Sequence, residues 1–179
     1  MTIPPSVLLY LALALYAVGT LIALASLFHR AQTMQHTALG AMIAGFASHT
    51  VWIGSVCVRT HHPPLTNLAE ASSFIAWTIF VVELVLFIRY RVHAASFFVY
   101  PLVLALLTVS AVVGDPIALL NPSLRSNLFT AHLLLSTVGV AALTVGVAFT
   151  ILAYLQDRSL KSKTRGPLWE LIPSLSVCR

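Results

Sequence analysis

Residues 37–58 read TALGAMIAGFASHTVWIGSVCV, a stretch with no lysine, arginine, aspartate or glutamate and with one histidine, His49. A helix needs about 20 predominantly apolar residues to cross a bilayer, and this stretch has that length. A polar ring at membrane depth is costly, so His49 requires a partner, which is another helix, a substrate or a metal. The stretch therefore predicts a membrane-spanning helix that carries a packing or binding group.

The composition of the whole chain is that of an integral membrane protein. Of its 179 residues, 59% are hydrophobic and only 8% are charged, and the mean hydropathy is +0.93. A soluble domain has about 25% charged residues. The formal net charge of +5 does not indicate nucleic acid, because the basic residues lie at the ends of apolar runs and form no single patch. We expect the lipid bilayer as the surroundings and no nucleic-acid partner.

Five apolar runs have the length of a membrane span, and they lie near residues 6–28, 37–58, 68–88, 94–113 and 128–155. The clearest break between them is His61-His62-Pro63-Pro64, because paired prolines do not continue a helix. We therefore predict an all-α, polytopic transmembrane helical bundle of about five spans. It forms one transmembrane helical domain over residues 1–165, and a C-terminal tail follows over residues 166–179. The first span is expected to be retained, because residues 1–7 lack the basic region of a signal peptide.

The positive charges predict the orientation of the spans. Seven basic residues fall on one side of the bilayer, and two fall on the other: Arg30, Arg89, Arg91, Arg158, Lys161, Lys163 and Arg165 against Arg59 and Arg125. Because cytoplasmic loops carry the excess of lysine and arginine, the N-terminus is expected outside and the C-terminus in the cytoplasm.

His49 and His132 lie inside different predicted spans, both toward the extracytoplasmic side. Imidazole is the usual axial ligand of haem iron, and a six-coordinate haem needs two such ligands at one depth. One interpretation is a non-covalent, b-type haem with both histidines as metal ligands, lined by Trp52, Trp77 and Phe46. The other is that His49 bonds a neighbouring carbonyl while His132 tops a small-residue stripe that packs on another helix. That stripe contains Ser136, Gly139, Ala142 and Gly146.

Of four other polar residues, three have both a structural and a functional interpretation, and Glu70 has a structural one. His61 and His62 are either solvated loop residues or transient iron ligands at the membrane surface. Glu70 lies at capping-box spacing from Asn67 and is expected to cap the third span. Glu83 is deeper in that span, where we expect it to pair with Arg89 or Arg91 or to act in a proton relay.

Three segments of the chain resemble the cytochrome c assembly protein family, which includes the CcsA, CcmC and HemX/YpjD-like membrane proteins. They are PLTNLAEASSFIAW at residues 64–77, AHLLLSTVG at residues 131–139 and YLQDRSLK at residues 154–161. They occur in the order found in the family, and the resemblance extends over residues 40–163, closest to the HemX/YpjD branch. The chain differs from the haem-handling synthetases of this family, because it lacks their tryptophan-rich external segment. The chain is also expected either to be a shortened form or to complete its site with another subunit.

The resemblance implies a multi-pass protein of the bacterial inner membrane that binds haem and delivers it for attachment to cytochrome c. His132 matches the family histidine of its motif, and His49 matches a membrane histidine in the second span. Expected partners are haem, other cytochrome c maturation subunits of the membrane and apocytochrome c. No catalytic residue is assigned, and the chain by itself is not expected to be an enzyme. The alternatives are a HemX-like membrane subunit or regulator of haem biosynthesis without its own haem, and a small transporter.

Overall fold

The computed structural model describes residues 5–29, 32–90, 95–114 and 126–162, and the described residues form helices joined by short connections. The five helices are α1 (Pro5–His29), α2 (Gln32–Thr60), α3 (Leu68–Tyr90), α4 (Ser96–Val113) and α5 (Asn127–Ser162). Each contains a segment that is long and apolar enough to span a membrane, and the described residues contain no strand. The prediction of an all-α bundle with five spans is confirmed. The expected tail at 166–179 lies outside the described residues, as do residues 115–125 between the fourth and fifth helices.

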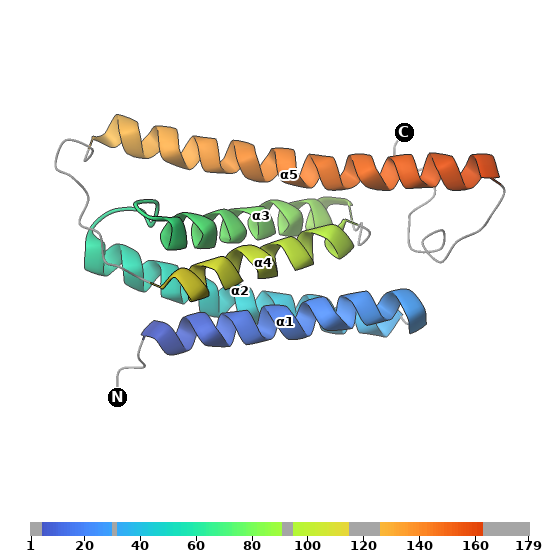
Figure 1. The fold of residues 1–179 in the computed structure, drawn as a ribbon, viewed down its shortest axis with the longest axis horizontal. Coiled ribbons are helices and arrows are strands. Elements are labelled where there is room, and N and C mark those ends of the chain that lie inside the picture. The colour runs from blue at the N-terminus through green and yellow to red at the C-terminus, as the bar shows by residue number, and fades with distance from the viewer. Residues whose placement is uncertain (1–4, 30–31, 91–94, 115–125, 163–179) are drawn as a thin grey trace.

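The helices run antiparallel to their neighbours in sequence, so α1, α3 and α5 begin, and α2 and α4 end, at one end of the bundle (Figure 1). We call this the amino end. The most extensive contacts are those of α1 with α2 and of α3 with α4, and α4 also packs on α1. The last helix, α5, contacts mainly α3 and touches α4 at fewer points. In Figure 1, α3 and α4 therefore lie between α5 and the pair formed by α1 and α2.

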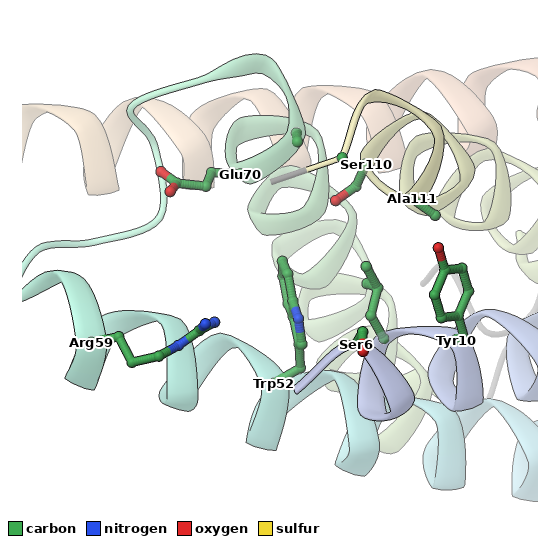
Figure 2. Close-up of a pocket in the computed structure, with 10 residues that line it drawn as sticks. Ser6, Tyr10, Trp52, Arg59, Glu70, Ser110 and Ala111 are labelled. Atoms are coloured by element: carbon green, nitrogen blue, oxygen red, sulfur yellow. The ribbon is translucent and has the colours of Figure 1, made fainter. Parts of the chain in front are cut away.

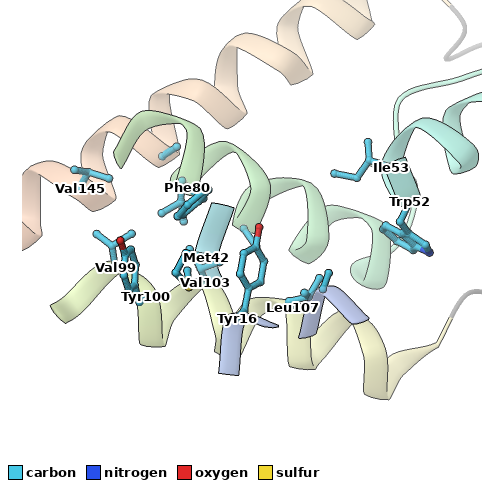
Figure 3. Packing of buried hydrophobic residues seen from close by; sticks show 14 of the residues in the cluster. Tyr16, Met42, Trp52, Ile53, Phe80, Val99, Tyr100, Val103, Leu107 and Val145 are labelled. Carbon is cyan, nitrogen blue, oxygen red and sulfur yellow. The ribbon is translucent and has the colours of Figure 1, made fainter. Parts of the chain in front are cut away.

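The core of the bundle lies between α1, α2, α3 and α4, and α5 adds Ala141, Val145 and Ala148 to it (Figure 3). Tyr16 of α1 is fully buried there, with its ring centroid 5.9 Å from that of Phe80 of α3. The close approach of α1 to α2 depends on Gly45, where a Cβ atom would lie 2.8 Å from the Tyr16 ring. The absence of a side chain at Gly45 thus admits the Tyr16 ring of α1.

Helix α5 packs along a different face from the expected one. Its buried positions are Thr137, Ala141, Val145, Ala148 and Leu152. The predicted small-residue stripe lies on the exposed side, and a Cβ atom at Gly139 or Gly146 would meet nothing within 4 Å. The expectation that this stripe packs is thus wrong for contacts within the described chain. The stripe is exposed because α5 meets α3 through the adjacent face, one position further round the helix.

The role of Gly45 is tested with Gly45→Ala, which places a methyl group against the Tyr16 ring. Because that ring is buried and cannot move outward, we expect the free energy of unfolding to fall by about 1–3 kcal/mol. Unfolding is followed by circular dichroism during titration of the detergent-solubilised protein with sodium dodecyl sulfate. The matched control is Gly54→Ala on the same helix, where a Cβ atom meets nothing within 4 Å. Equal destabilisation by both substitutions would contradict the close packing of α1 on α2.

Candidate functional site

His49 lies at the centre of the bundle, where it joins three helices. Its side chain is fully buried, and its two ring nitrogens have partners on either side. Nδ1 is 3.4 Å from the hydroxyl of Tyr16 on α1, and Nε2 is 2.7 Å from the hydroxyl of Ser73 on α3. Whichever nitrogen carries the proton, both nitrogens are engaged. The partner that the sequence required for this ring is therefore a pair of hydroxyl groups from neighbouring helices.

The aromatic residues expected to line a haem pack against other side chains. Phe46 stacks on Trp77 with ring centroids 5.5 Å apart, and the indole Nε1 of Trp77 donates a hydrogen bond to the Thr50 hydroxyl at 2.9 Å. Trp52 is buried, with its ring centroid 6.1 Å from that of His49. Phe46, Trp77 and Thr50 thus connect α2 with α3. Trp52 lines a separate cavity at the amino end.

His132 lies near the start of α5, on the exposed side of that helix. Helix α5 packs on α3, and α3 lies between α5 and α2, which carries His49 (Figure 1). The structure therefore does not bring His132 and His49 together around a common ligand. Within the described part of the chain there is also no group of three or more His, Cys, Asp and Glu side chains arranged to hold a metal ion.

The histidine pair between α2 and α3 separates into two different environments. His61 is exposed and has a positive φ of 57°, which turns the chain at the end of α2. His62 is buried, and its Nδ1 lies 2.9 Å from the carbonyl oxygen of Pro63. Since a carbonyl only accepts, Nδ1 is the donor of this hydrogen bond, and Nε2 is the nitrogen left for another partner. This Nε2 atom is buried and has no hydrogen-bond partner.

Glu70 caps the start of α3, as the sequence predicts. Its backbone N–H donates to Oδ1 of Asn67 at 2.8 Å, while its Oε2 accepts from the backbone N–H and hydroxyl of Thr66 at 3.0 and 2.6 Å. The second carboxylate oxygen, Oε1, is buried and has no hydrogen-bond partner. Glu70 therefore serves as a cap with one of its oxygens only.

Glu70 also lines a cavity of about 290 Å³ at the amino end, between α1, α2, α3 and α4 (Figure 2). The other residues that matter for its chemistry are Leu9 and Tyr10 of α1, Trp52 and Arg59 of α2, and Ser110 of α4. Ser110 is 2% exposed, and its hydroxyl has no partner. Ser110 is not identifiable from the sequence, because a serine in an apolar span has no pattern that places it at a cavity.

Glu83, the other carboxylate of α3, lies near the opposite end. It is 3% exposed, and its Oε1 accepts a hydrogen bond of 2.6 Å from the Ser96 hydroxyl of α4. The expected pairing with Arg89 is wrong, because the Arg89 guanidinium lies over the Tyr90 ring, 5.3 Å from its centroid. The other expected partner, Arg91, lies outside the described residues. Glu83 thus connects α3 to α4 in the same way that His49 connects α2 to α1 and α3.

Curated proteins of two kinds are similar to this chain. Protein HemX of Brevibacillus brevis is 24% identical over 166 residues, which are 92% of this chain and 61% of that protein. The cytochrome c biogenesis protein CcsA of Gloeobacter violaceus is 26% identical over 162 residues, covering 86% of this chain and 48% of that protein. The CcsA protein of Daucus carota is 27% identical over 143 residues, covering 75% and 44%. The chain thus spans about half the length of these relatives, and they confirm the family resemblance. No protein-family model and no solved structure matches the chain.

The interaction of His49 with Ser73 is tested by a double-mutant cycle of His49→Ala and Ser73→Ala. The two side chains share a buried hydrogen bond, so the effects on the free energy of unfolding should be non-additive by about 0.6 kcal/mol, the average for such bonds in membranes. The control cycle pairs His49→Ala with Ser72→Ala, since the Ser72 hydroxyl donates within its own helix to the Ala69 carbonyl. Additive effects in both cycles would show that the ring is held by packing alone.

Proposed function

We propose that this relative of HemX and CcsA is a haem-handling membrane component of the cytochrome c assembly type, which offers imidazole ligands at the amino end of its bundle. The five apolar helices and the relatives support a multi-pass membrane protein with a role of the cytochrome c assembly or HemX type. Haem delivery and non-covalent binding of a b-type haem are the finer part of the proposal.

The buried, unpartnered Nε2 of His62 is the single observation that carries the proposal. A buried acceptor without a partner costs about 1–3 kcal/mol, so a group that fills it stabilises the bound state. A neutral imidazole with its other nitrogen bonded to a backbone carbonyl has the arrangement found in histidines that bind metals. His62 therefore offers an unpartnered nitrogen of the kind that serves as an axial ligand.

His132 is a further histidine at this end, and like His61 it is exposed. Haem, when bound, supplies an iron that accepts imidazole ligands, and the chain's own contribution is to place the two rings at the amino end. His49 does not fit this role in the structure, since both of its nitrogens are engaged by Tyr16 and Ser73. We assign to His49, and to the stacked Phe46 and Trp77, the role of holding α1, α2 and α3 together.

The proposed location is the inner membrane of a bacterium, with the amino end facing outward. Among the described basic residues, Arg89, Arg158 and Lys161 lie on the last turns of α3 and α5 at the opposite end, and Arg59 lies at the amino end. This distribution supports a cytoplasmic position for the opposite end. The partners would then be apocytochrome c or other maturation subunits, which meet the histidines on the extracytoplasmic side.

A second candidate is a HemX-like membrane subunit or regulator of haem biosynthesis that has no haem of its own. The engagement of both His49 nitrogens favours it, as does the match to Protein HemX over 92% of this chain. Under this alternative the histidines of the amino end serve contacts with another protein.

The proposal is tested by adding haem to the detergent-purified protein and recording its visible spectrum. His62→Ala and His132→Ala are each expected to weaken haem binding by about tenfold or more, because each substitution removes an imidazole that would bind the iron or orient another ligand. His49→Asn, which keeps a polar group between Tyr16 and Ser73, is expected to leave the spectrum unchanged. His36→Ala on the first turns of α2, at the opposite end, is the matched control.

Loss of the Soret band in His49→Asn alone, with His62→Ala and His132→Ala unaffected, would contradict this assignment. A preparation that stays colourless with haem supplied would favour the HemX-like alternative. Imidazole added to His62→Ala is expected to restore binding, which a purely structural role of His62 would not do.

A further inference from the structure

Glu83 is an acidic side chain inside a membrane-spanning helix, and haem handling at the amino end does not use it. It lies about two turns before the end of α3 and is 3% exposed. It forms no ion pair with the described basic side chains, since Arg89 lies over the Tyr90 ring instead. A buried carboxylate without a counter-ion is costly in a membrane. The site therefore requires a positive charge, which is a proton or a metal cation.

Two hydroxyl groups of α4 lie beside the Glu83 carboxyl group. Ser96 Oγ is 2.6 Å from Glu83 Oε1, and Tyr100 is four residues further along the same face of α4. Both side chains are buried, and Tyr100 extends from α4 into the core (Figure 3). Tyr100 also interacts with both Ser96 and Glu83. Because a hydroxyl group both donates and accepts hydrogen bonds, these two residues can pass a proton to a carboxylate.

The other helices that pack on α3 bring no counter-ion to Glu83 within the described part of the chain. His49 of α2 faces Ser73, about three turns before Glu83 along α3. The described residues also contain no group of three or more His, Cys, Asp and Glu that could hold a metal ion. This favours a proton as the compensating charge. The buried positions of α5, the last helix that packs on α3, are uncharged: Thr137, Ala141, Val145, Ala148 and Leu152.

A small polar cavity extends from Ser96 and Tyr100 toward the opposite end of the bundle. It lies between α1, α2 and α4, and its volume of about 10 Å³ is close to what one water molecule requires. Its polar lining is completed by Ser26 of α1 and Gln35 of α2. A buried water makes about three hydrogen bonds, and the cavity offers four polar side chains. Gln35 is half-buried in the first turn of α2, so this polar lining reaches the surface at the opposite end.

We propose that Glu83 binds a proton inside the membrane, and that the proton arrives from the opposite end through Gln35, the small cavity and the Ser96 hydroxyl. A hydronium ion at the surface gives up one proton and becomes water. The Glu83 carboxylate takes up one proton and becomes a neutral carboxylic acid, with Ser96 donating to its carbonyl oxygen. On the orientation proposed above, the source of the proton is the cytoplasm. The proposal is independent of haem handling, because these residues lie away from the amino end.

Protonation of Glu83 is tested by infrared spectroscopy of the full chain at neutral pH, in a detergent without carbonyl groups. The chain has only five Asp and Glu residues, so the carbonyl band of one carboxylic acid can be resolved. The wild-type protein is expected to show this band, and Glu83→Gln is expected to lose it. Glu70→Gln is the matched control and should keep it, since the Glu70 carboxylate accepts two hydrogen bonds from Thr66. Absence of the band from the wild type, or its persistence in Glu83→Gln, would overturn the proposal.

Ser96→Ala tests the site even if Glu83→Gln fails to fold. The carbonyl oxygen of the acid loses its donor, so the band is expected to move to a higher frequency. An unchanged frequency would overturn the role of Ser96. Sodium chloride added at constant pH distinguishes the two cations. Loss of the wild-type band on this addition would show that a metal cation replaces the proton and would also overturn the proposal.

The route is tested by transferring the protein into heavy water, which lowers the frequency of the band as the acid proton exchanges for deuterium. Gln35→Leu keeps a side chain of similar size without its polar end, and we expect exchange to slow several-fold. The matched control is Thr33→Val, an exposed position in the same turn of α2 that does not line the cavity. It should exchange at the wild-type rate. Equal rates in the two variants would overturn entry of the proton through the cavity.

Discussion

The link from Tyr16 through His49 to Ser73 is the interaction on which the rest of this bundle depends. Hydrocarbon supplies no hydrogen bonds, so a buried imidazole must find its partners inside the protein. Here the two partners come from α1 and α3, and the ring therefore fixes the positions of three helices relative to one another. Gly45 makes this possible, because the Tyr16 ring lies where a Cβ atom would otherwise be. The buried polar group is thus a constraint on packing, because both of its nitrogens are engaged within the bundle.

This constraint divides the buried polar groups of the described residues into two sets. His49 and Glu83 are satisfied by hydroxyl groups of neighbouring helices, and they stabilise the contacts between those helices. One unsatisfied atom, Oγ1 of Thr20, lies in the second half of α1, away from the amino end. The other unsatisfied atoms are Nε2 of His62, Oε1 of Glu70 and Oγ of Ser110. All three of these lie at the amino end, where α2 and α4 end and α3 begins. Most of the unsatisfied buried atoms thus lie at this end, while His49 and Glu83 connect helices in the middle and at the opposite end.

The sequence was sufficient to predict the five spans and the Glu70 cap, because both follow from local information. Span length reflects the thickness of the bilayer, and a cap depends on residues three or four apart. Which face of a helix meets which neighbour depends on all helices together. Hydropathy predicts a similar depth for His49 and His132. It gives no information on how each helix is rotated about its own axis, and this rotation buries the His49 ring and exposes the His132 ring. For the same reason the sequence does not predict Ser73 and Tyr16 as the partners of His49. It also does not predict that Gly139 lies on the exposed side of α5.

Chemical modification of histidines tests most directly whether the His49 ring is held by its partners in the bundle. It is carried out on the folded, detergent-solubilised protein and quantified by peptide mass spectrometry. Diethyl pyrocarbonate reacts with an accessible imidazole nitrogen that is not already engaged. We expect His132 to react readily and His49 to be protected until the bundle is unfolded, since both His49 nitrogens are bonded and the ring is fully buried. Modification of His49 at the rate of His132 in the folded protein would contradict the central role of the Tyr16–His49–Ser73 link.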